Sequence, residues 1–251
     1  MSTSDAETTC DAFLGGRLVL EQPRKGYRAG VDPVLLAAAV PARAEQSVLE
    51  LGCGVGCALF ALATRVDGLD LTGVEVQGEY AALARANAAR NGLTAQIHTA
   101  DLADLPEPVR QRRFDHVVAN PPYYVPRSGT PPRGADRATA HREDLPLARW
   151  IETGARRLAP KGLMTVIQRA DRLADLLGAM AANLGSLEVR PLQPRTGRAA
   201  SLVIVSGRKG GKTPLVLHPP IVMHDGASHG KDGEDYAPAI RGVLRDGAAL
   251  P

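Results

Sequence analysis

The chain has 251 residues, 44% of them hydrophobic and 23% charged, which suits one globular α/β core with modest additions. Its net charge of +3 is too small to identify a polyanionic partner unless the charges cluster. No apolar run approaches the roughly 18 residues that span a bilayer, and the first residues lack the basic and apolar regions of a secretory signal. We therefore expect a cytoplasmic protein with no membrane role.

The first part of the chain predicts a β-hairpin followed by a short helix. Residues 17–20 and 25–28 can pair across the proline-containing turn between them. Asp32 and the proline that follows it are typical of a helix N-cap and first turn. An apolar helix is therefore expected over residues 34–40.

From residue 47 onward, predicted strands alternate with predicted helices. The predicted strands cover residues 48–51, 71–75, 96–98, 114–119, 162–168, 187–192 and 201–206. The predicted helices cover residues 57–65, 78–91, 146–158 and 171–184. This alternation is typical of βαβ units, so we expect an α/β fold with a seven-stranded parallel sheet.

Two further segments are predicted from composition. Residues 125–145 are rich in Pro, Gly and Arg and are too long for an ordinary connection, so they form either a functional lid or a disordered segment. A basic turn over 207–213 precedes a predicted hairpin of 214–217 with 221–223. We accordingly divide the chain into an N-terminal cap (1–47), a core (48–206) and a C-terminal basic hairpin and tail packed on the core (207–251).

The three cysteines do not indicate a disulfide framework or a metal site. Cys10, Cys53 and Cys57 are an odd number, and none of them forms a Cys-x-x-Cys pair. We therefore expect no bound metal.

The first core strand runs into a glycine-rich turn that predicts a cofactor site. Gly52, Gly54 and Gly56 let the backbone approach a ligand closely, and the following helix offers free N–H groups. A nicotinamide fingerprint would require glycine where Cys57 stands and has no standard use for the acid Glu50. Glu50 instead suits a ligand that carries an ammonium group, such as the amino group of a methionine moiety.

Two further acids follow predicted strands at the edge where open α/β sheets bind ligands. Glu75, followed by Val76, ends the second core strand 23 residues after Gly52, where an acid can hold both hydroxyls of a ribose. Asp101 can accept a hydrogen bond from an adenine amine, and its neighbour Leu102 can pack on the ring. Each acid alone is typical of a solvated loop, and their shared position favours a cofactor site.

The most specific motif is Asn120, Pro121, Pro122 and Tyr123, directly after the fourth core strand. It resembles the motif of Rossmann-like methyltransferases that modify planar amino groups. The Asn120 side-chain oxygen and the Pro121 carbonyl can accept the two hydrogens of an exocyclic amine and hold its nitrogen in line with a methyl donor. Tyr123 can stack on the base. The alternative is a simple turn, since these residues also favour turns.

The segment 13–40 resembles that of the bacterial tRNA(1)(Val) adenine-N6 methyltransferases, and the resemblance extends through most of the chain. It implies a Rossmann-like class I methyltransferase fold, S-adenosylmethionine as cofactor, and tRNA as substrate, with adenine 37 beside the anticodon as the methyl acceptor. It also implies that Tyr27, Arg28, Gly30 and Asp32 close over the cofactor, with a helix cap as the alternative role of Asp32.

Basic residues lie in three segments that we expect to flank one pocket and contact RNA. They are Arg17, Arg24, Lys25 and Arg28 near the start, Arg127, Arg133, Arg137 and Arg142 in the long loop, and Arg208, Lys209 and Lys212 in the C-terminal turn. Splayed bases of a single-stranded loop would suit such a site. The residues around Lys212 do not form a phosphate loop, because Ser206 replaces its first glycine.

Two other functions remain open at this point. A glutamine-N5 methyltransferase of a protein such as a release factor would use the same Asn-Pro-Pro-Tyr chemistry, but such enzymes carry a helical N-terminal domain, whereas only 47 residues precede the first core strand here. A noncatalytic RNA-binding protein could keep the fold, although an intact Asn120 and Tyr123 speak against it.

Overall fold

A computed structural model describes residues 7–123, 145–226 and 235–251. Its strands are β1 (Thr8–Phe13), β2 (Leu18–Pro23), β3 (Ser47–Leu51), β4 (Asp70–Glu75), β5 (Ala95–Thr99), β6 (Phe114–Ala119), β7 (Leu158–Arg169), β8 (Gly185–Gln193), β9 (Leu202–Arg208), β10 (Val216–Leu217) and β11 (Ile221–Val222). Its helices are α1 (Asp32–Ala39), α2 (Cys57–Arg65), α3 (Gly78–Arg90), α4 (Glu107–Gln111), α6 (Leu147–Arg157), α7 (Leu173–Asn183) and α8 (Pro238–Asp246), with 3-10 turns η1 (Leu14–Gly16) and η2 (Ala170–Arg172).

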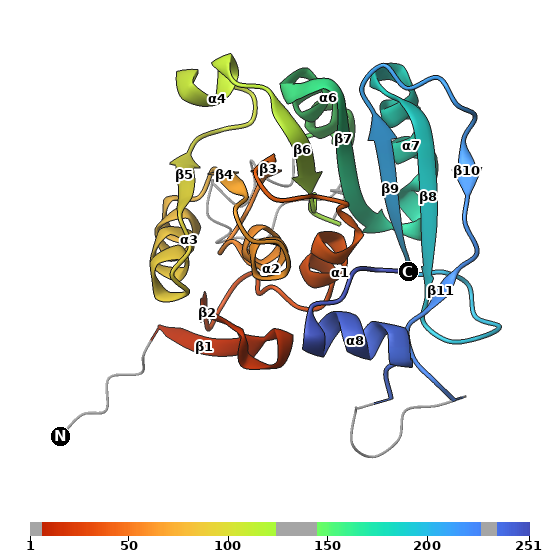
Figure 1. The fold of residues 1–251 in the computed structure, drawn as a ribbon, viewed down its shortest axis with the longest axis horizontal. Coiled ribbons are helices and arrows are strands. Elements are labelled where there is room, and N and C mark those ends of the chain that lie inside the picture. The colour runs from red at the N-terminus through yellow and green to blue at the C-terminus, as the bar shows by residue number, and fades with distance from the viewer. Residues whose placement is uncertain (1–6, 124–144, 227–234) are drawn as a thin grey trace, which may run out of the picture.

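The central sheet confirms the expected α/β class (Figure 1). Its strand order is β10-β8-β9-β7-β6-β3-β4-β5, and β11 also pairs with β8. Strands β3 to β7 run parallel, while β9 runs antiparallel to both β7 and β8. From β3 the chain adds β4 and then β5 on one side, and it then returns to place β6 on the other side of β3. This reversal between β3 and β6 is where open parallel sheets form their ligand crevice.

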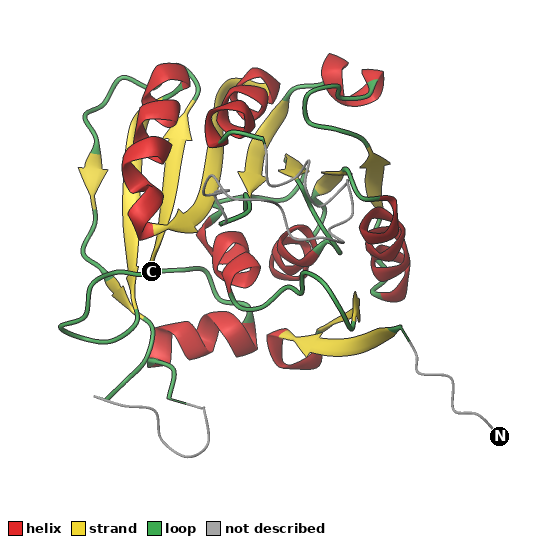
Figure 2. Ribbon diagram, turned by 180° about the vertical axis from the view of Figure 1, so that it is seen from behind, coloured by secondary structure: helices red, strands yellow, loops and turns green. Residues whose placement is uncertain are grey.

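The sheet is covered on both faces, which Figures 1 and 2 show from opposite sides. Alternate strand residues point to opposite faces. Val48 and Val118 belong to a core with α1, α2, α3 and α8, whereas their neighbours Leu49 and Val117 belong to a second core with α4, α6 and α7. The near-continuous apolar runs of the central strands follow from this double coverage.

The N-terminal hairpin is present, but its predicted pairing is wrong. Strand β2 pairs antiparallel with the preceding β1, not with residues 25–28. Gln22 explains the difference: its side-chain oxygen accepts a hydrogen bond from Ala29 N–H at 2.8 Å, and its amide donates to Asp11 at 2.8 Å. The segment after Pro23 is therefore held by side chains, and it remains irregular.

The predicted C-terminal hairpin is also wrong. Strands β10 and β11 do not pair with each other, and each pairs in parallel with β8, as the partners Val216 and Glu188, and Ile221 and Leu192, show. Three residues separate β10 from β11, and over this distance the chain continues along the same edge of β8 without reversing. These short strands therefore extend the existing sheet edge.

The C-terminal tail forms helix α8, which the sequence pattern did not indicate clearly. Pro238 opens the helix, and Gly247 follows it with a φ of 59°, a left-handed value that favours glycine. Ile240 and Val243 are buried against the first core, where α8 contacts η1 and α1 (Figure 1). The N- and C-terminal segments thus share one core with α1. Within the described ranges, no helix is both long and apolar enough to cross a membrane.

Candidate active site

The glycine-rich turn joins β3 to α2 at the carboxyl end of the sheet. Gly52, Gly54 and Gly56 have φ values of 64°, 55° and 91°, all in the left-handed region that side chains disfavour. At Gly56, an added Cβ would lie 2.1 Å from the ring of Phe60. The turn therefore requires glycine both for its backbone conformation and for its packing on the helix.

A pocket lies between this turn, the segment around Tyr27 and the end of β6. It is lined by Tyr27, Ala29, Pro33, Glu50, Gly52, Cys53, Gly54, Val55, Cys57, Ala58 and Asn120. It thus brings together five residues that the sequence predicted, from three separate segments. Because β3 and β6 are neighbours, the pocket coincides with the reversal in strand order.

Glu50 is 2% exposed and lies beneath the turn. One of its carboxylate oxygens accepts a hydrogen bond from Leu59 N–H at 2.9 Å. Leu59 lies in the first turn of α2, whose N–H groups lack intrahelical partners, so Glu50 caps this helix from a distance. Burial raises the pKa of the Cys57 thiol well above its usual value, and the charge of the nearby Glu50 adds a smaller effect in the same direction. The pocket floor therefore combines a buried carboxylate with an uncharged thiol.

Glu75 connects the end of β4 to the same turn. It is 1% exposed, and its two oxygens accept hydrogen bonds from Gly54 N–H at 2.9 Å and Gln77 N–H at 3.0 Å. Glu75 therefore fixes the glycine turn to the end of β4.

The segment around Tyr27 lies over the glycine turn. The Tyr27 carbonyl accepts a hydrogen bond from the Tyr80 hydroxyl at 3.1 Å, and the Tyr27 side chain is 45% exposed. A Cβ added to Gly54 would lie 4.0 Å from the Tyr27 ring. Asn120 Nδ2 lies 3.4 Å from the Tyr27 hydroxyl oxygen. Tyr27 therefore bridges the glycine turn and the motif after β6.

The Asn-Pro-Pro-Tyr motif is held at both of its ends. Gln168, which is 1% exposed on β7, places its Nε2 at 3.5 Å from the Pro121 carbonyl oxygen. The Tyr123 hydroxyl donates to an Asp32 oxygen at 2.7 Å. Burial and the adjacent Asp32 raise the pKa of Tyr123 well above its usual value, so this hydroxyl remains a donor. The N-cap of α1 is Val31, and Asp32 is the first residue of the helix with its side chain bound to Tyr123, so the predicted cap role of Asp32 is wrong.

Other predicted cofactor residues lie around the pocket and do not line it. Arg28 forms an ion pair with Asp11 at 2.5 Å and donates to the Pro23 carbonyl at 2.7 Å. Gly30 is exposed, and Val76 is half-buried directly after Glu75. Asp101 is exposed and accepts a hydrogen bond from Ala103 N–H at 2.8 Å, whereas Leu102 is buried in the second core. Their roles toward a cofactor stay predictions.

The predicted RNA-contacting residues are separated in space. Arg127, Arg133, Arg137 and Arg142 lie outside the described residues. Arg208, the last residue of β9, pairs with Leu163 of β7, whereas Gln168 near the end of β7 lies beside Pro121. Arg208 and the next residue, Lys209, are therefore at the opposite end of the sheet, and the expectation that their segment flanks the same pocket is wrong. Lys212 is exposed in the turn that follows β9.

Three residues that position the site were missed by sequence analysis. Gln22 holds the backbone of Ala29, Tyr80 holds that of Tyr27, and Gln168 reaches Pro121. The available signal was weak: Gln168 is a polar residue at the end of an apolar run, where a buried side chain requires a hydrogen-bond partner. Over the described ranges, no cluster of His, Cys, Asp and Glu could hold a metal ion.

Structural comparison places this geometry among methyltransferases. A predicted O-methyltransferase from Agrobacterium tumefaciens superimposes with a TM-score of 0.69 at 25% identity, over 87% of this chain and 97% of that one. A 16S rRNA N2 G1207 methyltransferase from T. thermophilus, in complex with AdoMet and guanosine, superimposes with a TM-score of 0.58 at 19% identity, over 80% of this chain and 50% of that one. The second likeness is one of fold.

Sequence comparison is more specific. Residues 29–190 match the methyltransferase small domain family. The tRNA1(Val) (adenine(37)-N6)-methyltransferase of Dickeya chrysanthemi is 30% identical over 243 residues, covering 93% of this chain and 92% of that protein. The protein of the same name from Porphyromonas gingivalis is 34% identical over 174 residues, covering 66% and 68% of the two chains. The chain therefore belongs to the methyltransferase small domain family and, within it, to the tRNA1(Val) (adenine(37)-N6)-methyltransferases.

Proposed function

We propose that this chain transfers a methyl group from S-adenosylmethionine to N6 of an adenine in tRNA, with adenine 37 of tRNA1(Val) as the specific acceptor. The observation that carries the proposal is the position of Asn120 in the same pocket as the glycine turn and the buried Glu50. The names of the relatives support the choice of RNA and of the adenine. In this proposal residues 1–47 act as the cap of the site, with Tyr27 as its contact.

The residues of the pocket fit this cofactor. S-Adenosylmethionine supplies an electrophilic methyl group on a positively charged sulfur. Glu50 and Glu75 place two buried carboxylates beside the glycine turn, which suits the ammonium group and the ribose hydroxyls of such a molecule. The absence of a side chain at Gly54 leaves room between the turn and Tyr27. Glu50 would hold the ammonium end, and Glu75 the ribose.

Asn120 and Pro121 would hold the amine that accepts the methyl group. Because Asn120 Nδ2 lies toward the Tyr27 hydroxyl, its Oδ1 is oriented to the other side and can accept a hydrogen bond from N6. The Pro121 carbonyl has two lone pairs, and Gln168 approaches only one of them at 3.5 Å. Two acceptors that bind both amine hydrogens would orient the nitrogen lone pair toward the methyl group.

Tyr123 would provide the surface on which the adenine stacks. Its hydrogen bond to Asp32 at 2.7 Å fixes the ring relative to α1. Base–aromatic stacking contributes about 1–3 kcal/mol for each base. No side chain has to act as a base, since the amine can lose its proton to water after methyl transfer.

The direct experiment is transfer of labelled methyl groups to tRNA isolated from cells that lack this gene, followed by nucleoside mass spectrometry. N6-methyladenosine in the tRNA is the expected product, and mapping then tests position 37. Label in a release factor with none in tRNA would support a glutamine-N5 methyltransferase. A chain that binds the cofactor but labels neither substrate would support a noncatalytic RNA-binding protein.

A further inference from the structure

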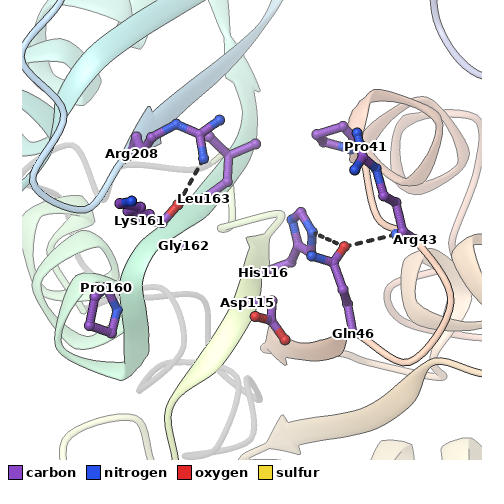
Figure 3. A pocket seen from close by; sticks show the side chains of 10 residues that line it. All are labelled: Pro41, Arg43, Gln46, Asp115, His116, Pro160, Lys161, Gly162, Leu163 and Arg208. Carbon is purple, nitrogen blue, oxygen red and sulfur yellow. Dashed lines mark hydrogen bonds between the residues drawn. The ribbon is translucent and has the colours of Figure 1, made fainter.

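A second cavity lies at the amino ends of the central strands, opposite the candidate active site. Its volume is about 400 Å³, and its lining comes from the segments before β3, at the starts of β6 and β7, and at the end of β9 (Figure 3). The lining residues are Pro41, Arg43, Gln46, Asp115, His116, Pro160, Lys161, Gly162, Leu163 and Arg208. None of them belongs to the motifs used above for methyl transfer.

The floor of this cavity is hydrogen-bonded, and its one charged group is the Asp115 carboxylate. Gln46 Oε1 accepts a hydrogen bond from Arg43 N–H at 2.8 Å and lies 3.0 Å from His116 Nε2 (Figure 3). His116 is 5% exposed, and this burial lowers the pKa of its ring. The charges of Arg208 and Arg65 also lower this pKa, whereas the charge of Asp115 raises it. Because the pKa is lowered overall, the ring is neutral near pH 7. The Asp115 carboxylate accepts two hydrogen bonds from Ser47, at 2.9 and 2.8 Å.

The rim of the cavity is cationic. Arg43, Lys161 and Arg208 are all exposed, and Figure 3 shows Arg43 on one side and the other two on the opposite side. Arg208 donates to the Lys161 carbonyl at 2.8 Å. Within residues 7–123, 145–226 and 235–251, none of these three side chains forms a salt bridge. Three positive charges therefore surround one half-buried carboxylate that is already hydrogen-bonded.

The positive charge continues beyond the cavity along the same end of the sheet. Arg113, Arg157 and Lys209 bind backbone carbonyls, and in the described part of the chain none of them has a carboxylate partner. Burial lowers the pKa of Lys209, and Arg113 and Arg157 lower it further. Burial and then Arg113 likewise lower the pKa of Arg157. These side chains therefore repel one another in the isolated protein.

A purely structural role does not explain this arrangement. Other surface cations of this chain lie beside acids, as Arg172 does with Asp175 and Arg90 does with Glu21. Six unpaired cations on one face raise the electrostatic free energy of the folded chain, and a polyanion would remove that cost. Phosphate groups suit guanidinium and ammonium side chains in this density.

We infer that this amino-end face, formed by Arg43, Arg113, Arg157, Lys161, Arg208 and Lys209, binds backbone phosphates of the substrate RNA, with the cavity as the seat of one phosphate. This inference rests on the proposed function. A strand of six residues spans about 20 Å, so a stem of several base pairs that extends from the methylated loop can reach from one end of the sheet to the other. The face anchors the RNA at a distance from the reacting adenine.

The test compares tRNA binding by the full chain and by the triple variant Arg43→Gln, Lys161→Gln, Arg208→Gln over a series of salt concentrations. Each lost phosphate contact reduces the slope of log affinity against log salt by about 0.7–0.9. The expected result is a slope shallower by about 2–3 and an affinity lower by roughly 10- to 100-fold at 0.15 M salt. Unchanged S-adenosylmethionine affinity would show that the variant is folded.

The matched control removes three cations that lie elsewhere and are already paired with acids: Arg90→Gln, Arg172→Gln and Arg190→Gln. It should keep the wild-type slope, whereas an equal loss would attribute the effect to net charge and overturn the inference. A titration with inorganic phosphate, followed by the NMR resonances of the His116 imidazole, distinguishes a phosphate of the RNA from a free phosphate as the occupant of the cavity. Phosphate-dependent shifts with unchanged tRNA binding by the triple variant would assign the cavity to a small free anion and contradict the RNA contact.

Failure of this inference and failure of the proposed function give different results. A wild-type chain that neither binds nor methylates tRNA would remove the proposed function itself. If the wild-type chain methylates tRNA and the triple variant binds tRNA equally well, the RNA-binding role of the amino-end face is refuted and the proposed function is kept.

Discussion

The two ends of the sheet differ in which charged side chains they gather and in how those side chains are held. At the carboxyl end, Glu50 and Glu75 are buried, and backbone N–H groups of the glycine turn and of α2 fix them. At the amino end, cations such as Arg208 and Lys209 bind backbone carbonyls and have no carboxylate partner among the described residues. One end thus suits a positively charged small molecule held in a fixed geometry, and the other suits an extended polyanion.

This contrast follows from the topology. Parallel strands gather their carboxyl ends at one edge, where the strand-to-helix turns present N–H groups and short loops. The antiparallel β9 instead delivers the end of its sequence, Arg208, to the opposite edge beside Leu163 of β7. A single antiparallel strand therefore separates the basic C-terminal turn from the motifs that precede it. The variants below test whether chemistry and RNA binding are separated in the same way.

The largest effect is expected for Asn120→Ala. Loss of one of the two acceptors for the amine should lower the rate of methyl transfer by about 100- to 1,000-fold. Cofactor affinity should change little, because Glu50, Glu75 and the glycine turn are kept. The measurement pairs single-turnover transfer of labelled methyl groups with calorimetry of cofactor binding. Asn183→Ala, an exposed change on α7, is the control, and wild-type turnover by Asn120→Ala would refute the assigned role.

The next largest effect is expected for Glu75→Ala, and it should fall on cofactor affinity. Removal of a charged acceptor that also orders Gly54 should weaken binding by about 10- to 100-fold, since hydrogen bonds to charged groups contribute about 1.5–3 kcal/mol. Calorimetric titration measures this change. Glu75→Gln retains the shape of the side chain and should recover part of the affinity. Unchanged affinity in both variants would exclude Glu75 from the ribose site.

A smaller effect is expected for Tyr123→Phe, which keeps the ring and removes the hydrogen bond to Asp32. A loss of about 1 kcal/mol predicts a kcat/KM for tRNA that is lower by roughly fivefold. Since burial and Asp32 raise the pKa of Tyr123, the wild-type rate should show no titration of this hydroxyl up to pH 10. A wild-type rate that falls between pH 8 and 10, with Tyr123→Phe insensitive over that range, would contradict this environment.

The smallest effect is expected for Arg113→Gln at the amino end. The free energy of unfolding should change by less than about 0.5 kcal/mol, because Arg113 is exposed and, in the described part of the chain, its side chain binds nearby backbone carbonyls alone. Affinity for tRNA should fall by about fourfold at 0.15 M salt, which corresponds to one phosphate contact. Urea unfolding and filter binding measure the two quantities. Unaltered RNA affinity would remove Arg113 from the RNA-binding face.

Local sequence signals predicted the carboxyl end of the sheet well. The strand before the glycine turn, the turn itself and the Asn-Pro-Pro-Tyr motif each lie within a few consecutive residues, and their alternation with helices predicts which sheet edge they share. The structure accordingly has Glu50, Gly54 and Asn120 lining one pocket. That they bind cofactor and amine stays a prediction.

Contacts between distant segments could not be predicted in this way. The Gln22 side chain replaces the strand pairing expected for residues 25–28, and Gln168 reaches Pro121 across 47 positions of sequence. Helix α8 carried only two local signals, Pro238 and Gly247, and its burial depends on α1 and η1. The separation of Arg208 from the active site depends on the direction of β9, which its residue pattern does not encode.

The most direct test of the account measures tRNA binding and single-turnover methyl transfer in parallel for Asn120→Ala and for the Arg43, Lys161 and Arg208 triple glutamine variant. The account predicts opposite defects. Asn120→Ala should bind tRNA with wild-type affinity and transfer almost no methyl groups, whereas the triple variant should bind weakly and transfer at the wild-type rate once tRNA is saturating. Equal losses of binding and of saturated transfer in both variants would contradict the separation of chemistry and RNA anchoring between the two ends of the sheet.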